Sequence, residues 1–150
     1  MSGKRSEVGK SRVLFVCIHN SARSQMAEAY LNTLAGDRFE AMSAGIEPGI
    51  LNPLVVESMK QDGIDISKNT TKSVFDFYKQ GKTFNYVITV CDREAAERCP
   101  VFLGVTERLH WGFKDPSKFE GAKDEIMGQI AAVRDEIKAA VIKFAESHGR

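Results

Sequence analysis

The sequence predicts an α/β fold, a single domain with a four-stranded parallel sheet and helices on both faces in a flavodoxin-like, doubly wound arrangement. Short apolar runs rich in β-branched and aromatic residues alternate along the chain with longer segments of helical periodicity. The 150 residues suffice for one domain with a sizeable core, and no repeat, low-complexity run or linker divides them. We expect this domain over residues 12–150, preceded by a polar, disordered arm over residues 1–11.

Four apolar runs are expected to form the strands. They are residues 13–16, 39–44, 86–90 and 105–111, of which the last is the weakest. The first run, Val-Leu-Phe-Val, is apolar throughout, as is typical of a strand buried on both faces.

Five segments are expected to be helical, namely 25–34, 52–63, 73–80, 92–98 and 118–147. Proline at position 53 suits the first turn of the second helix, and Gly63 ends it. One apolar stripe runs along the last helix and consists of Ile126, Ile130, Val133, Ile137, Val141 and Phe144.

Bulk properties exclude several classes of protein. A net charge of +1 argues against a broad nucleic-acid-binding or membrane surface. No apolar stretch approaches the roughly 20 residues that span a bilayer, and no signal peptide is visible. We therefore expect a cytoplasmic protein, by default a monomer.

The chain has three cysteines, and in a reducing cytoplasm these are expected to be chemical rather than structural. Cys91 and Cys99 do not have zinc-site spacing, and the histidines are scattered, so no metal site is expected.

The first strand leads into a loop, residues 17–24, that closes onto the start of a helix. Backbone N–H groups and the helix dipole form an anion-binding nest there, and the planar fork of Arg23 can hold two oxygens of a tetrahedral anion. The same field favours the thiolate of Cys17, the reactive form. A purely structural role for Ser24 is to cap the helix, and its functional role is to donate to this thiolate; the two roles are compatible. The expected oxyanion-binding residues are Ile18, His19, Asn20, Ser21, Ala22 and Arg23. The competing interpretation of Cys17 is a small buried hydrophobe.

Ligands of open α/β sheets bind beyond the carboxyl ends of the strands. Cys17 and Cys91 both follow predicted strands, and Asp115 follows the fourth. The topology therefore predicts that these three groups converge on one crevice.

The chain resembles thioredoxin-coupled arsenate reductases built on the low-molecular-weight tyrosine phosphatase fold. The matching stretches are 16–28 (VCIHNSARSQMAE), 43–47 (SAGIE), Asn52-Pro53, Asp65-Ile66-Ser67, 90–100 (VCDREAAERCP) and 110–116 (HWGFKDP). The resemblance extends over nearly all of residues 12–147 and implies a low-molecular-weight phosphatase-like domain. It implies arsenate as substrate, phosphate or sulfate as competing oxyanions, and no tightly bound cofactor. It favours thioredoxin as external electron donor, with glutathione–glutaredoxin or another low-molecular-weight thiol as the alternative.

By this resemblance Cys17 is the nucleophile, and Asn20, Arg23 and Ser24 shape the oxyanion site. Asp115 resembles the general acid, and Cys91 and Cys99 resemble a redox pair. Reduction of arsenate takes two electrons, which a dithiol supplies when it becomes a disulfide. We expect a disulfide to form between Cys17 and Cys91 and then to pass to Cys91 and Cys99. The helix over 92–98 is expected to be short and exposed when reduced and to unwind on oxidation.

Three positions depart from the family's pattern or are ambiguous. Ala22 stands where some relatives carry a further cysteine, which removes one site of oxidative damage. His19 is either a neutral donor behind the site or an exposed loop residue. Several of these reductases bind potassium through residues that match Asn20, Glu28 and Ser43 plus an acid, and Lys72 falls at the place of that acid. We expect its ammonium to replace the cation, unless Lys72 is simply solvated.

Two other functions are compatible with the loop. A low-molecular-weight protein tyrosine phosphatase explains Cys17, Arg23 and Asp115 but leaves Cys91 and Cys99 without a task. It would also favour an aromatic residue after Pro116, where this chain has serine. A non-catalytic redox or oxyanion-sensing module is the third candidate, and the complete set of reactive residues argues against it.

Overall fold

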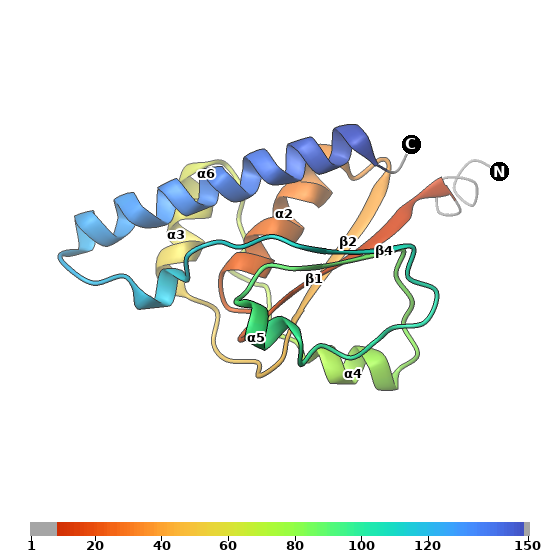
Figure 1. Cartoon of the computed structure of the whole chain (residues 1–150). Helices are drawn as coiled ribbons and strands as arrows, with labels where there is room; N and C mark the ends of the chain where they lie inside the picture. Colours follow the sequence, from red (N-terminus) through yellow and green to blue (C-terminus); the bar gives the residue numbers. More distant parts are fainter. Residues whose placement is uncertain (1–8, 149–150) are drawn as a thin grey trace.

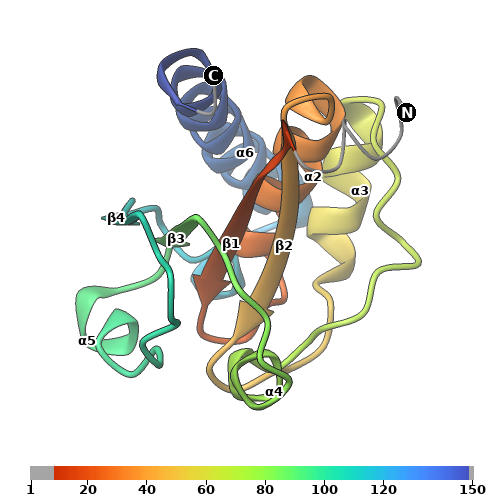
Figure 2. The same cartoon turned by 90° about the vertical axis from the view of Figure 1, so that its right-hand side faces the viewer.

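A four-stranded sheet, parallel throughout, forms the centre of the protein (Figures 1 and 2). The computed structural model describes residues 9–148. The strands are β1 (Ser11–Cys17), β2 (Phe39–Gly45), β3 (Tyr86–Thr89) and β4 (Glu107–His110), in the order β2-β1-β3-β4. This confirms the predicted fold class. The first strand begins at Ser11, and residues 1–8 of the expected arm lie outside the described residues.

Helices cover both faces of the sheet (Figure 2). On one face lie α2 (Arg23–Ala35), α3 (Pro53–Gln61) and α6 (Lys123–Ser147), and α6 packs against both of the others. On the other face lies α4 (Val74–Lys79), while the single turn of α5 (Arg93–Ala96) lies near the carboxyl end of β1 (Figure 1). A sheet enclosed in this way leaves its ligand-binding edge at the strand ends.

The central strand β1 is buried on both sides. Val13 and Phe15 pack into the cluster beneath α2, α3 and α6, whereas Leu14 and Val16 pack into the cluster beneath α4. All four side chains are fully buried. The unbroken apolar run in the sequence is thus explained by burial on alternate faces of a parallel strand.

The last helix begins later than expected. Residues 116–118 form a separate 3₁₀ turn, in which Asp115 Oδ1 accepts a hydrogen bond of 3.0 Å from the Ser117 N–H. The α-helix begins only at Lys123, where the Glu125 carboxylate accepts from the Ala122 N–H at 2.9 Å. Its predicted apolar stripe lies in the core, although Ile126 is only partly buried.

The end of β2 packs closely against the loop that follows β1. The Ile46 N–H donates to the Cys17 carbonyl (3.0 Å), and the Glu47 N–H donates to the Ile18 carbonyl (2.7 Å). A Cβ atom on Gly45 would lie 2.7 Å from the Ile18 carbonyl oxygen and 2.8 Å from the Asn20 nitrogen. Only glycine fits at this position without displacing the loop backbone.

We predict that Gly45→Ala lowers the free energy of unfolding by about 1–3 kcal/mol, since backbone atoms must move to admit the methyl group. Denaturant unfolding measures the effect. Gly128→Ala is the matched control, because nothing lies within 4 Å of its added Cβ in α6. That control is expected to stabilise the protein by about 0.5–1 kcal/mol. An unchanged unfolding free energy for Gly45→Ala would contradict the prediction.

Candidate active site

The oxyanion loop, residues 17–24, joins β1 to α2 and surrounds the Cys17 sulfur. Cys17 is buried, and its Sγ accepts from the Asn20 N–H at 3.1 Å and lies 2.9 Å from Ser24 Oγ. Asn20 has a φ of 55°, in the left-handed region that asparagine tolerates better than most residues. The Asn20 N–H points at the sulfur, and the chain turns sharply just after it. Both contacts suit a thiolate, which accepts hydrogen bonds and donates none.

Ser24 does not cap the helix, contrary to the prediction. Helix α2 begins at Arg23, with Ala22 at its N-cap position and no side-chain cap bond. The helix starts two residues earlier than expected, so Ser24 already lies within its first turn. Its hydroxyl accepts from Asn20 Nδ2 at 2.8 Å and contacts Cys17 instead.

The Asn20 side chain joins the loop to two other segments. Asn20 is fully buried, its Nδ2 donates to Ser43 Oγ at 2.9 Å, and its Oδ1 accepts from the Lys72 N–H at 2.9 Å. Ser43 in turn donates to the Glu28 carboxylate, and Lys72 Nζ lies 3.8 Å from Glu28 Oε1. The structure therefore brings together the four residues of the predicted cation-site network.

Gln25 supports the same loop. The sequence predicted it only as the first residue of a helix and gave it no role in the site. Its fully buried amide donates to both the backbone carbonyl and the Oδ1 of Asn20 at 3.1 Å, and to the Thr70 carbonyl at 3.0 Å. Asn69 Nδ2 donates to its oxygen at 3.0 Å. The available signal was an uncharged amide directly after Arg23-Ser24 and before apolar helix residues.

Arg23 and Asp115 face each other across the loop. The buried guanidinium donates to the Phe113 carbonyl at 3.2 Å, and its Nη2 lies 3.5 Å from Asp115 Oδ2. Burial of Asp115 opposes its ionisation, but hydrogen bonds from Ser117 and the charge of Arg23 outweigh burial and lower the pKa of the carboxyl. The Phe113 carbonyl was not among the predicted groups, because a backbone acceptor leaves no trace in the sequence.

The other loop residues support the backbone. His19 is exposed, and its Nδ1 lies 2.8 Å from the Glu47 carbonyl oxygen, so the structure places it as an outward-facing loop residue. Ile18 and Ser21 are half-buried, and Ala22 is buried. The Ser21 carbonyl accepts from the Asn52 N–H at 3.0 Å.

Cys91 lies beside Cys17 at the edge of the sheet. The N–H of Val90, the residue directly after β3, donates to the Val16 carbonyl of β1 at 2.8 Å, so the two cysteines follow hydrogen-bonded residues at the ends of adjacent strands. Such strands lie about 4.8 Å apart. Cys91 shares a buried cluster with Cys17, whereas Cys99 belongs to the cluster on the opposite face of the sheet. All three cysteines are free thiols.

Burial makes both later cysteines weak acids. It raises the pKa of Cys91 to about 11, with the charge of Cys17 adding to the shift. It also raises the pKa of Cys99 to about 11, although the Arg108 guanidinium opposes this shift. Cys91 and Cys99 are therefore almost entirely protonated at neutral pH.

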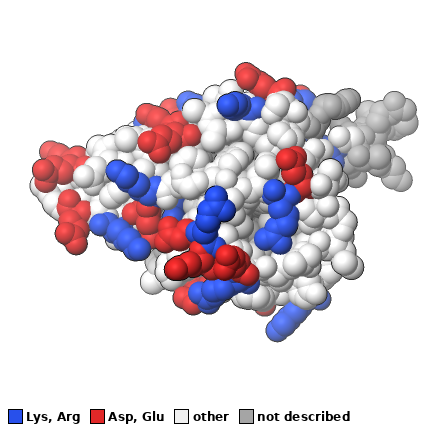
Figure 3. Space-filling model, viewed as in Figure 1, with Lys and Arg blue, Asp and Glu red and all other residues white. Residues whose placement is uncertain are grey.

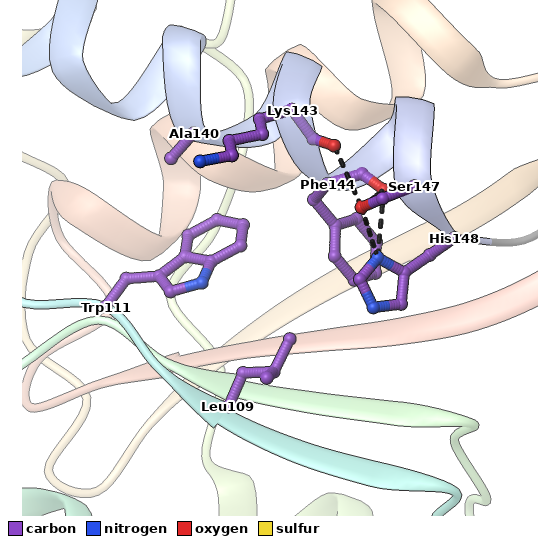
Figure 4. A pocket seen from close by; sticks show the side chains of 7 residues that line it. All are labelled: Leu109, Trp111, Ala140, Lys143, Phe144, Ser147 and His148. Carbon is purple, nitrogen blue, oxygen red and sulfur yellow. Dashed lines mark hydrogen bonds between the residues drawn. The ribbon is translucent and has the colours of Figure 1, made fainter.

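A separate pocket lies between β4 and α6 (Figure 4). Trp111, Lys143, Phe144 and His148 line it, and none of the residues of the oxyanion loop does. The Trp111 ring also packs on Phe15, with ring centroids 5.9 Å apart. Ser147 also lines the pocket, with its Oγ 2.9 Å from His148 Nδ1, but no cysteine does, so the pocket is separate from the site around Cys17.

Surface and metal-binding features add little to the site. Acidic and basic side chains are interspersed on the face that Figure 3 draws. Within residues 9–148, no group of three or more His, Cys, Asp or Glu side chains is placed to hold a metal ion. In the same range, the helices are too short or too polar to cross a membrane.

Similarity to known sequences covers nearly the whole chain. A sequence model of the low molecular weight phosphotyrosine protein phosphatases matches residues 12–150. An arsenate reductase of Shouchella clausii is 41% identical over 141 residues, which are 93% of this chain and 99% of that protein. An arsenate reductase of Bacillus subtilis is 41% identical over 135 residues, 90% of this chain and 95% of that protein.

Solved structures show the same fold. An arsenate reductase in the phosphate binding state has a TM-score of 0.73 and 28% identity, covering 91% of this chain and 98% of its own. A thioredoxin-dependent arsenate reductase of Corynebacterium glutamicum has a TM-score of 0.62 and 29% identity. The match covers 95% of this chain and 67% of that one. A tyrosine phosphatase of Erwinia amylovora shares the fold, with a TM-score of 0.72 and 18% identity. The match covers 94% of this chain and 95% of that one. The chain therefore belongs to the low molecular weight phosphotyrosine protein phosphatase family.

Proposed function

We propose that this protein is a cytoplasmic arsenate reductase that converts arsenate to arsenite through a relay of three cysteines and is recycled by thioredoxin. One observation carries the proposal. Cys91, a second free thiol, lies at the strand end beside the Cys17 nucleophile, and Cys99 follows it a short helix later. The arsenate reductases among the relatives support the choice of substrate, and the thioredoxin-dependent structural neighbour supports the electron donor.

The first step is nucleophilic. Arsenate binds to the N–H groups of the oxyanion loop and to Arg23, and the Cys17 thiolate attacks arsenic. Asp115 lies next to Arg23 and protonates the departing oxygen, which leaves as water. An incoming oxyanion competes with Asp115 for Arg23, which weakens one of the contacts that lower the pKa of the carboxyl, while the hydrogen bonds from Ser117 remain. Phosphate and sulfate have the same shape and are expected to compete with arsenate.

Two thiol exchanges complete the chemistry. Cys91 gives up its thiol proton and attacks Cys17 Sγ, the sulfur–arsenic bond breaks, and its electron pair leaves with arsenic as arsenite, which takes up the proton. Cys99 then attacks Cys91, which releases the Cys17 thiolate and leaves a disulfide between Cys91 and Cys99. Thioredoxin returns two electrons and two protons to this pair and becomes a disulfide itself.

The second exchange requires a change of conformation. Cys91 and Cys99 lie in clusters on opposite faces of the sheet and are separated by the turn of α5. A disulfide needs Cα atoms about 4.4–6.8 Å apart. As predicted, the segment between the cysteines contains a short helix whose side chains are mostly exposed. We propose that this helix unwinds when the disulfide passes to Cys99.

A tyrosine phosphatase is the second candidate. The same loop, Arg23 and Asp115 would serve hydrolysis of a phosphate ester, in which phosphorus keeps its oxidation state. That function gives Cys91 and Cys99 no role. Slow hydrolysis of a small aryl phosphate is compatible with a reductase, whereas fast hydrolysis would favour the phosphatase.

We further propose that Lys72 takes the place of a bound potassium ion. Its Nζ lies 3.8 Å from Glu28 Oε1 and donates to the Thr70 carbonyl at 3.2 Å, and its backbone N–H holds Asn20 Oδ1. An ammonium beside Glu28 supplies the positive charge that a cation would bring.

For the relay, we predict that NADPH is consumed continuously when arsenate, thioredoxin and thioredoxin reductase are supplied to the parent protein. Cys99→Ser is expected to stop after one arsenite per enzyme, since the Cys17–Cys91 disulfide cannot be passed on. Hydrolysis of an aryl phosphate by the same variant is the control and should equal that of the parent. Sustained turnover by Cys99→Ser would refute the relay, and no NADPH consumption by the parent would refute the thioredoxin assignment.

For the cation network, we predict that exchanging sodium for potassium at constant ionic strength leaves turnover unchanged. Lys72→Glu is expected to create potassium dependence, because it offers the cation a second carboxylate beside Glu28. Lys68→Glu makes the same charge change at an exposed position and is the matched control. A large potassium-specific gain in the parent would show that Lys72 does not replace the ion.

For the two later thiols, we predict that alkylation of Cys91 and Cys99 in the reduced protein accelerates about tenfold per pH unit between about pH 8 and 10, since only the thiolate reacts. Mass spectrometry of the alkylated peptides follows each site. In denaturant, the alkylation rates of both cysteines should stop rising just above about pH 8.5, the ordinary thiol pKa. The raised pKa values of about 11 also mean that their contribution to stability is full below about pH 8.5 and is lost toward pH 11. A plateau below about pH 9 in the native protein would contradict the assignment.

A further inference from the structure

The redox segment, residues 91–99, is tied to the oxyanion loop by one ion pair. Arg98 Nη2 donates to Glu47 Oε2 at 2.7 Å, although the two residues are 51 positions apart in the sequence. The Arg98 hydrogen bond also lowers the pKa of Glu47, so this carboxylate is charged at neutral pH. The pair therefore joins the residue directly before Cys99 to the segment that follows β2.

Glu47 is itself fixed to the oxyanion loop on both sides. Its N–H donates to the Ile18 carbonyl at 2.7 Å, and its carbonyl oxygen lies 2.8 Å from His19 Nδ1. The preceding N–H, of Ile46, donates to the Cys17 carbonyl at 3.0 Å. The backbone that carries the Glu47 carboxylate is thus held by the loop around Cys17.

Oxidation cannot leave Arg98 where it is. In the reduced structure the Arg98 N–H donates to the Ala95 carbonyl at 3.0 Å, and the Cys99 N–H donates to the Ala96 carbonyl at 3.1 Å. These bonds hold Cys99 in the cluster on the far face of the sheet from Cys91. Bringing the two Cα atoms to disulfide distance breaks this turn and carries Arg98 with it.

We propose that Arg98 and Glu47 are a positioning pair, which holds the redox segment in its reduced conformation and so favours the Cys91–Cys99 dithiol over the disulfide. This inference rests on the proposed relay. The pair would promote the reset of the segment after each turnover, because it forms again only when the turn before Cys99 is rebuilt. Among the described residues, Arg93 on the same segment has no ion-pair partner, so the tie depends on Arg98.

The test is the equilibrium between the Cys91–Cys99 dithiol and its disulfide in Cys17→Ser protein, where no other pair can form. Oxidised dithiothreitol takes two electrons and two protons from the protein dithiol and becomes reduced dithiothreitol. Arg98→Gln and Glu47→Gln, each in this background, are expected to shift the equilibrium toward the disulfide about two- to fivefold at low salt, as befits an exposed ion pair. The double variant should shift no further than either single variant, and high salt should diminish the difference.

Two further variants separate charge pairing from a general structural effect. Arg93→Gln removes the same charge from the same segment and should leave the equilibrium unchanged. Exchange of the two charges, Arg98→Glu with Glu47→Arg, should restore the parent equilibrium. Parent-like values for Arg98→Gln and Glu47→Gln, or an equal shift for Arg93→Gln, would overturn the positioning pair alone. Failure of the Cys17→Ser parent to form any Cys91–Cys99 disulfide would instead overturn the relay on which the inference rests.

Discussion

The left-handed backbone of Asn20 is the constraint on which the rest of the site depends. A non-glycine residue with a φ of 55° is strained, and such strain persists only where the surroundings determine it fully. At this turn the Asn20 N–H points at the Cys17 sulfur, and the chain then leads into helix α2. The site therefore needs a side chain at position 20 that can be held firmly on every polar atom, and asparagine provides both a double donor and an acceptor.

Three segments meet this requirement from different parts of the chain. Helix α2 contributes Ser24 and Gln25, strand β2 contributes Ser43, and the loop before α4 contributes the Lys72 backbone. Buried polar groups stabilise a structure only when all their hydrogen bonds are made. A buried polar group without a partner destabilises the protein more than an apolar group of the same shape would. The arrangement around Asn20 is complete, and the order of the sheet makes it possible because β2 lies directly beside β1. Fold and site are therefore specified by the same contacts.

Much of this was accessible from the sequence, because burial and helical periodicity are local signals. The apolar run of β1 and the stripe of α6 predicted their elements, and the strand-end positions of Cys17, Cys91 and Asp115 predicted one common edge. The Ser24 cap was wrong because the start of α2 is decided by the loop that precedes it. The contact between Arg23 and the Phe113 carbonyl spans 90 positions, and the Gln25 contacts to Asn69 and Thr70 span more than 40. Such contacts depend on the assembled fold, which no local pattern encodes.

The deep burial of Cys91 and Cys99 also affects how readily the two thiols are oxidised. Peroxide and other oxidants attack thiolates that they can reach, and overoxidised cysteines are lost irreversibly. Cys91 and Cys99 are 1% and 6% exposed and protonated at neutral pH, so they are poor targets for such damage. Because Cys91 and Cys99 lie on opposite faces of the sheet, an oxidant cannot join them in a disulfide without a change of conformation. In the proposed relay, both thiols therefore stay reduced until arsenate has formed its adduct with Cys17.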